Sequence, residues 1–111
     1  MELQIGTARK GDACVVTVAG EVDIYTSPAL KTALAAAATE GCPLLIVDLN
    51  GVGFIDSSGL GVLVGALRRV REAGGDLRVV SGNETVARIL RITGLDQVFS
   101  LHAALDEALE A

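Results

Sequence analysis

The chain has 111 residues, of which 50% are hydrophobic, and its formal net charge is -5 at pH 7. A chain of this length is sufficient for one modest core, so we expect a single domain over residues 1–111. Because nucleic-acid binding requires a basic surface and the only basic cluster is at residues 68–71, the composition argues against a nucleic-acid partner and favours a protein or a small molecule.

The first part of the sequence predicts a β-hairpin followed by a helix. Residues 3–8 and 14–20 are short apolar runs rich in β-branched side chains, and the letters RKGD between them suit a tight turn. We therefore expect two antiparallel strands. Residues 26–41 predict a helix, which Thr26 or Ser27 can cap at its N-terminus.

The rest of the chain alternates apolar runs with segments of helical periodicity. The predicted elements are a buried strand at 43–50 that residues 52–55 extend or follow, a helix that ends at Gly74 and Gly75, a strand at 76–81, a helix at 83–94, a short strand at 97–101 and a helix at 103–111. This order predicts an α/β domain whose mostly parallel sheet begins with a hairpin. The pattern alone leaves open whether the helices cover one face of the sheet or both.

Cys14 and Cys42 show neither CxxC spacing nor a neighbouring histidine. We therefore expect two reduced thiols in or near the core and no metal site. Residues 1–12 lack the pattern of a secretion signal, and no run approaches the roughly 18 apolar residues of a membrane span. The sequence thus predicts a cytoplasmic protein without a membrane segment.

The letters FIDSSGLG at residues 54–61 carry the most chemistry, because they lie between a buried strand and a helix. Such turns are where ligands and reactive groups gather in α/β domains. Asp56 or Ser57 could simply cap the helix. The glycine spacing of a hydrolase nucleophile elbow, a dinucleotide fingerprint or a Walker loop is absent. The only histidine, His102, follows a predicted strand and favours a helix-start or surface position over a catalytic role.

A covalent phosphate on Ser57 is the remaining chemistry, and it is physically reasonable. The phosphate would lie at a helix N-terminus, where free N–H groups and the helix dipole tolerate negative charge. It would also add about 1.5 to 2 negative charges beside Asp56. The two-serine motif therefore suits a switch that releases a partner without unfolding the domain.

Three stretches, at residues 20–30, 48–67 and 74–109, resemble the STAS-domain anti-sigma factor antagonists. The letters GEVD in the first and DSSGLG in the second form a specific combination, and the resemblance covers nearly the whole chain. It implies a sheet of four or five strands with about four helices mainly on one face. It also implies partner switching: the unphosphorylated antagonist binds an anti-sigma factor that is also a serine kinase, and a phosphatase reverses the phosphorylation.

The resemblance also assigns site residues in this sequence. The phosphoacceptor is the first serine after the acid, Ser57. The partner-binding residues that it implies are Asp23, Asp56, Ser58, Gly59 and Gly61.

The expected protein is thus a binding module with no enzyme activity and no cofactor of its own, monomeric when alone. It uses ATP only through the kinase. The alternative is a STAS module that is not phosphorylated and that binds a small molecule or serves as a scaffold in a signalling or transport assembly.

Overall fold

The computed structural model describes residues 2–111 and has the predicted order of strands and helices. Its elements are β1 (Gln4–Lys10), β2 (Ala13–Val22), α1 (Ser27–Ala38), β3 (Leu44–Ile55), α2 (Ser57–Glu72), β4 (Asp76–Val80), α3 (Glu84–Ile92), the 3-10 turn η1 (Leu95–Gln97), β5 (Ser100–His102) and α4 (Leu105–Glu110). None of the helices within residues 2–111 has both the length and the apolar character needed to cross a membrane.

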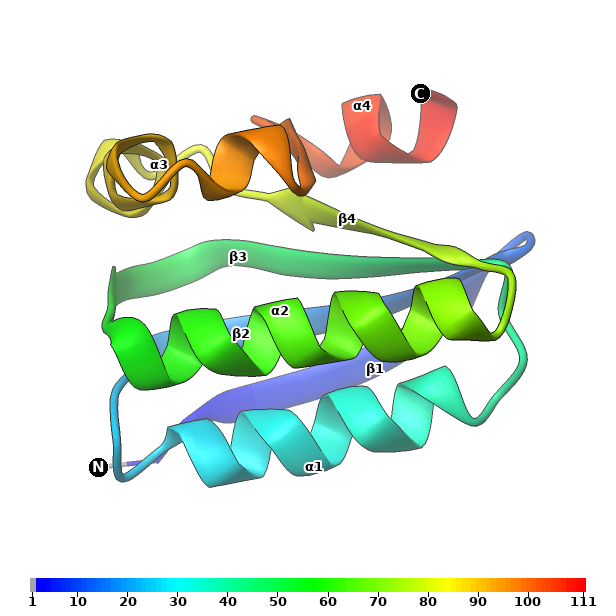
Figure 1. Cartoon of the computed structure of the whole chain (residues 1–111), viewed down its shortest axis with the longest axis horizontal. Coiled ribbons are helices and arrows are strands. Elements are labelled where there is room, and N and C mark those ends of the chain that lie inside the picture. Colours follow the sequence, from blue (N-terminus) through cyan, green and yellow to red (C-terminus); the bar gives the residue numbers. More distant parts are fainter. Residues whose placement is uncertain (1) are drawn as a thin grey trace.

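The strands form one mixed sheet in the order β1-β2-β3-β4-β5. β1 and β2 form the antiparallel hairpin, and each later pair of neighbours is parallel. Parallel neighbours require a crossover connection, which α1, α2 and α3 provide in turn. Figure 1 shows α1 and α2 side by side, both beginning at the same edge of the sheet.

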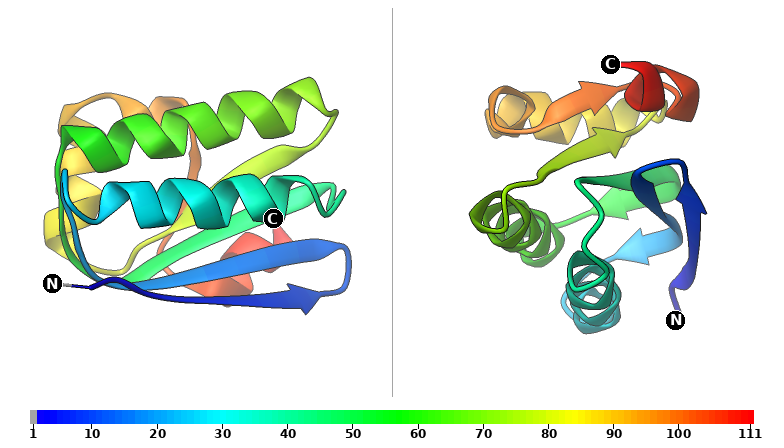
Figure 2. Two further views of the ribbon diagram at one scale, coloured as in Figure 1. Left: turned by 90° about the horizontal axis from the view of Figure 1, so that it is seen from below. Right: turned by 90° about the vertical axis from the view of Figure 1, so that its right-hand side faces the viewer.

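The two faces of the sheet are covered unequally. The main core lies between one face and the helices α1, α2 and α3, which contribute Leu34, Leu63 and Leu90 among others. The opposite face carries a smaller cluster, in which Ala108 of α4 packs with Ile46 of β3. Figure 2 shows α1 and α2 together on one side of the sheet. The expectation of helices mainly on one face is confirmed.

β3 is the strand that positions the functional motif. Its pairing with β4 ends at Asp48, but β3 continues beside β2 as far as Ile55, so residues 52–55 extend the strand. Gly51 allows the two strands to approach, because an added Cβ there would lie 2.8 Å from the Cβ of Ala19. The extension carries Asp56 to the end of β2, where α2 begins.

β5 is shorter than predicted and begins three residues later, at Ser100. The cause is the connection from α3: Gly94 adopts a left-handed conformation with φ of 77°, and η1 follows it. The N–H of Phe99 then donates to the carbonyl of Leu95 at 2.8 Å, and the Phe99 side chain enters the core. The apolar residues of this segment therefore pack before the strand starts.

Cys14 and Cys42 form a disulfide, so the expectation of two reduced thiols is wrong. The cause is the register of the sheet, in which Cys14 of β2 lies opposite Leu45 of β3, only three residues after Cys42. The two Cα atoms are 5.8 Å apart, within the usual range for a disulfide. The bond ties the connection before β3 to β2.

Candidate functional site

Residues 54–61 lie at the edge of the sheet where β2 and β3 end and where α1 and α2 begin (Figure 1). The N–H of Asp56 donates to the carbonyl of Val22 at 3.0 Å, which joins the end of β2 to the start of α2. Both helices present their N-terminal, partially positive ends at this edge. The predicted position of the motif at a strand-to-helix turn is confirmed.

Asp56 is the N-cap of α2. Its Oδ1 accepts hydrogen bonds from the N–H groups of Ser58 at 2.9 Å and Gly59 at 3.2 Å, and from the Ser58 hydroxyl at 2.5 Å. The hydroxyl of Ser58 is the largest influence that lowers the pKa of Asp56; the N–H groups of Gly59, Ser58 and Ile24 act in the same direction, and partial burial opposes them. Asp56 is therefore ionised at neutral pH and places a negative charge beside Ser57.

The two serines of the motif are in different environments. Ser57 is the first residue of α2 and is exposed, and its hydroxyl has no hydrogen-bond partner within residues 2–111. Ser58 is half-buried, and its hydroxyl already donates to the carboxylate of Asp56. Phosphoryl transfer requires an accessible hydroxyl oxygen. The geometry therefore favours Ser57 over Ser58 as an acceptor.

Asp23 organises the loop that connects β2 to α1. Its Oδ1 accepts hydrogen bonds from the N–H groups of Tyr25 at 2.9 Å and Thr26 at 3.0 Å. The Thr26 hydroxyl donates to the carbonyl of Glu21 at 2.8 Å, so this side chain holds the loop and makes no cap to α1. In the same loop, the N–H of Ile24 helps to lower the pKa of Asp56. The loop that contains Asp23 and the cap residue Asp56 therefore lie at the same edge of the sheet.

Three large apolar side chains are exposed around this edge, and the sequence analysis missed them. Ile24 is 67% exposed and Tyr25 is 88% exposed in the loop after β2, and Phe54 is 44% exposed near the end of β3. Exposed apolar side chains that gather beside polar groups are typical of protein–protein contacts. The available signal was the pair Ile24 and Tyr25, which lies between an acid and a helix start, where polar loop residues are usual.

The glycines of the motif have different functions. Gly59 is buried, and an added Cβ would lie 2.5 Å from Cγ1 of Val22 and 2.8 Å from Cγ1 of Ile55. Gly59 therefore allows α2 to begin close against the ends of β2 and β3. Gly61 is exposed, and apart from the adjacent backbone of α2 no heavy atom in the described part of the chain lies within 4 Å of an added Cβ. Of these two, only Gly61 is accessible to a partner.

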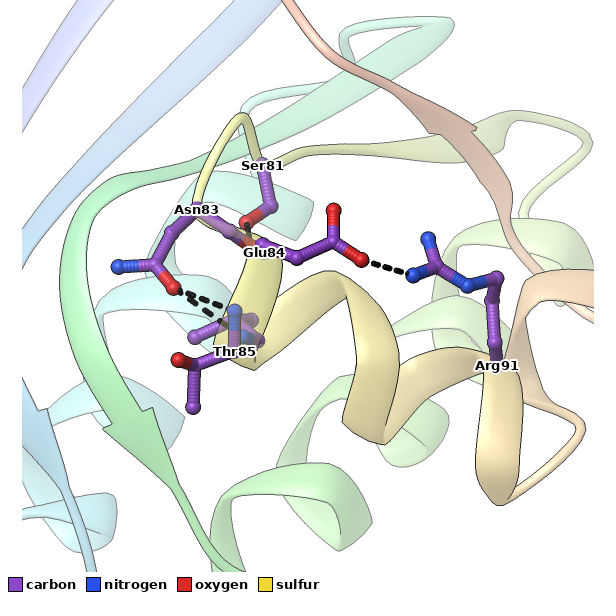
Figure 3. A network of polar contacts seen from close by, with 6 residues as sticks. Ser81, Asn83, Glu84, Thr85 and Arg91 are labelled. Atoms are coloured by element: carbon purple, nitrogen blue, oxygen red, sulfur yellow. Dashed lines mark hydrogen bonds and ion pairs between the residues drawn. The ribbon is translucent and has the colours of Figure 1, made fainter.

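A second polar network lies at the start of α3 (Figure 3). The side-chain oxygen of Asn83 accepts a hydrogen bond from the N–H of Thr85 at 2.8 Å, and Ser81 donates to the carbonyl of Asn83 at 3.3 Å. Glu84 and Arg91 form an ion pair along the helix. Asn83 thus caps α3, Ser81 holds Asn83 in place, and the ion pair joins two turns of the helix. We therefore assign this network a structural role at the start of α3 and no role in the site around Ser57.

His102 lies on β5, and its Nε2 is 2.7 Å from the hydroxyl of Ser100. Within residues 2–111, its side-chain hydrogen bond is to Ser100 and not to a serine of the motif. Across residues 2–111, no group of three or more His, Cys, Asp and Glu side chains is placed to hold a metal ion.

Comparisons with known proteins agree with this geometry. The family model of the STAS domain matches residues 4–108. The chain is 34% identical over 103 residues to the anti-sigma-B factor antagonist of Bacillus subtilis, which covers 93% of this chain and 94% of that protein. It is 36% identical over 93 residues to the anti-sigma-B factor antagonist of Listeria monocytogenes, which covers 84% of this chain and 82% of that protein. A crystal structure of an anti-sigma factor antagonist from Mycobacterium paratuberculosis superimposes with a TM-score of 0.91 at 33% identity, over 97% of this chain and 92% of that chain.

Proposed function

The chain belongs to the STAS-domain family, among the anti-sigma factor antagonists, and on that premise we propose that it is a partner switch controlled at Ser57. The unphosphorylated protein binds an anti-sigma factor and thereby frees the sigma factor. The anti-sigma factor is also a serine kinase that phosphorylates Ser57, and the phosphate releases it. A serine phosphatase restores the binding form. The antagonist itself has no catalytic role.

The observation that carries the proposal is the difference between the two serine hydroxyls. Ser57 offers an exposed hydroxyl to which no side chain or backbone group of residues 2–111 forms a hydrogen bond, whereas the hydroxyl of Ser58 is held by Asp56 at 2.5 Å. Ser58 thus completes the helix cap, and Ser57 is available for modification. These two different roles explain why the motif contains two serines.

The structure supports a phosphate on Ser57 that leaves the fold intact. Ser57 lies at the N-terminus of a helix of 16 residues, where the helix dipole favours negative charge. Its side chain is exposed, so an added phosphate displaces solvent and not core atoms. We expect the domain to remain folded after modification.

The same phosphate is well placed to repel a partner. It adds about 1.5 to 2 negative charges next to the ionised Asp56. If the partner places one carboxylate about 6 Å from the phosphate, each unit pair costs roughly 3 kcal/mol at an effective dielectric of about 20. Since about 1.4 kcal/mol is a tenfold change in affinity, one such contact is sufficient for release.

The partner-binding face in this proposal surrounds Ser57. Asp23 and Asp56 supply its negative charge, and the exposed side chains of Ile24 and Tyr25 supply apolar contact area. Tyrosine is a frequent energetic centre of protein interfaces, because it buries a large area with few rotatable bonds. We therefore place Tyr25 at the centre of the contact.

The test is to incubate the protein with ATP and its purified anti-sigma factor, and then to measure intact mass and map the phosphate. We expect one phosphate on Ser57 and none in Ser57→Ala. Ser58→Ala is the matched control and should still be phosphorylated, because its hydroxyl is not the acceptor. A phosphate on Ser58, or none from an active kinase, would contradict the switch; the latter would favour a STAS module that only binds or serves as a scaffold.

A further inference from the structure

A hollow of about 310 Å³ lies between α1 and α2, on the surface of the helix pair. α2 lines it with Ser58, Gly61, Gly65 and Arg69, which follow one another on a single face of the helix. α1 contributes Lys31 near its first turn. Figure 2 shows the two helices running side by side along this surface. The α2 stripe is about 16 Å long at 1.5 Å per residue, which is the length of three helical turns.

The fold itself does not require glycine in this hollow. Beyond the neighbouring backbone of α2 itself, no heavy atom of residues 2–111 lies within 4 Å of a Cβ added at Gly61 or at Gly65, in contrast to Gly59. Glycine inside a helix is less favourable than alanine, so two of them in α2 weaken a helix that could be stronger. What they provide is a shallow floor, on which another chain can approach the backbone of α2 closely.

The charge of the hollow is opposite to that of the protein. Lys31 and Arg69 belong to its lining, and no Asp or Glu does, although the chain has a formal net charge of -5. The two ion pairs formed within residues 2–111 join Arg71 to Asp76 and Arg91 to Glu84. Within that part of the chain, neither Lys31 nor Arg69 forms an ion pair.

We propose that this hollow seats a helix of the anti-sigma factor that carries small or apolar residues toward Gly61 and Gly65 and acidic residues toward Lys31 and Arg69. The proposal rests on the proposed function, because the occupant is the same partner. A helix fits the three-turn length and the small floor, since small side chains at a contact bring helix axes close together. The unpaired cations select an acidic occupant.

The hollow is continuous with the proposed switch, because Ser58 lines it and directly follows Ser57. A partner that covers Ser57 therefore extends naturally along α2. Acidic residues at the Lys31 end of such a helix would also be repelled by a phosphate on Ser57, because α1 and α2 begin at the same edge of the sheet and like charges oppose binding. The hollow thus gives a physical reason why one phosphate releases this partner.

The test uses the purified anti-sigma factor, titrated calorimetrically against four variants of the full chain. Gly65→Leu fills the hollow and Arg69→Glu reverses one of its charges; we expect each to weaken binding at least tenfold. Arg68→Glu makes the same charge change on the neighbouring residue of α2, which does not line the hollow, and should stay within about twofold of wild type. The melting temperature of Gly65→Leu should equal or exceed that of wild type, because leucine favours the helix.

Ser57→Asp is measured beside these variants, so that the results show whether the inference about the hollow or the proposed function is wrong. If Ser57→Asp binds weakly while Gly65→Leu and Arg69→Glu bind as wild type does, the switch stands and the inference about the hollow is overturned. If the wild-type chain does not bind the anti-sigma factor, both are overturned. If the chain alone forms a dimer that Gly65→Leu abolishes, the occupant is a second copy and the inference is again wrong.

Discussion

The packing of Gly59 leads to a prediction that compares two identical substitutions in one helix. In Gly59→Ala, the new Cβ would lie 2.5 Å from Cγ1 of Val22 and 2.8 Å from Cγ1 of Ile55, and both neighbours are fully buried. Overpacking of this kind costs about 1 to 3 kcal/mol, and the overlap with two fixed side chains places it near the upper end. Alanine returns about 1 kcal/mol of helix propensity, so we expect a net loss of about 2 kcal/mol.

Gly61→Ala is the matched control, because among residues 2–111 its Cβ meets no heavy atom within 4 Å other than the adjacent backbone of its own helix. It should gain up to about 1 kcal/mol from helix propensity alone. The two variants should therefore differ by about 3 kcal/mol in the free energy of unfolding, which is about 10 °C or more in melting temperature for a domain of this size.

Urea unfolding followed by far-ultraviolet circular dichroism is the suitable assay, because the chain has no tryptophan and its one tyrosine, Tyr25, is 88% exposed. The slopes of the unfolding transitions should be equal, so that the midpoints report stability directly. Equal midpoints for Gly59→Ala and Gly61→Ala would refute the close packing of α2 against the strand ends.

Three further predictions follow from particular contacts. Asp56→Asn should be less stable than wild type at pH 7. The pKa of Asp56 is lowered in the folded protein, so its carboxylate stabilises the fold at pH values above the ordinary pKa of 3.8, and this stabilisation is lost when the carboxylate is protonated at lower pH. The difference in stability between the two proteins should therefore close as pH falls below about 3.8, and a difference that thermal melts find constant down to pH 2 would contradict this. Reduction of Cys14–Cys42, which are 28 residues apart, should cost about 3 to 4 kcal/mol and lower the melting temperature by about 15 °C; alkylation of the unreduced, denatured protein detected by mass would show that the bond is absent. Tyr25→Ala should weaken binding of the anti-sigma factor at least tenfold in calorimetry without a change in melting temperature, and unaltered affinity would remove Tyr25 from the interface.

Local sequence patterns predicted most of the fold, because most of it is determined locally. The continuous apolar run that begins at Leu44 predicted a buried strand, and the polar residues that follow it predicted the cap that Asp56 forms. The shift of β5 to Ser100–His102 was not predictable from apolar periodicity, because Phe99 packs into the core from the connection that precedes the strand.

Features that depend on distant residues could not be predicted in this way. Nothing near Cys14 in the sequence indicates Cys42, because their proximity follows from the register between β2 and β3. Similarly, two adjacent serines look alike in the sequence, whereas in the structure Ser57 is exposed and Ser58 is half-buried and donates a hydrogen bond to Asp56. Both the helix-start position and the family resemblance predict Ser57 as the phosphoacceptor, and the exposure of its side chain supports that prediction.

In the proposed switch, one phosphate on Ser57 changes the affinity for the anti-sigma factor and leaves the fold intact. The most direct measurement compares the dissociation constants of the unmodified and the Ser57-phosphorylated protein for that partner, with melting temperatures from the same preparations. We predict binding at least tenfold weaker after phosphorylation, with nearly equal melting temperatures. Equal dissociation constants for the two forms would contradict the claim.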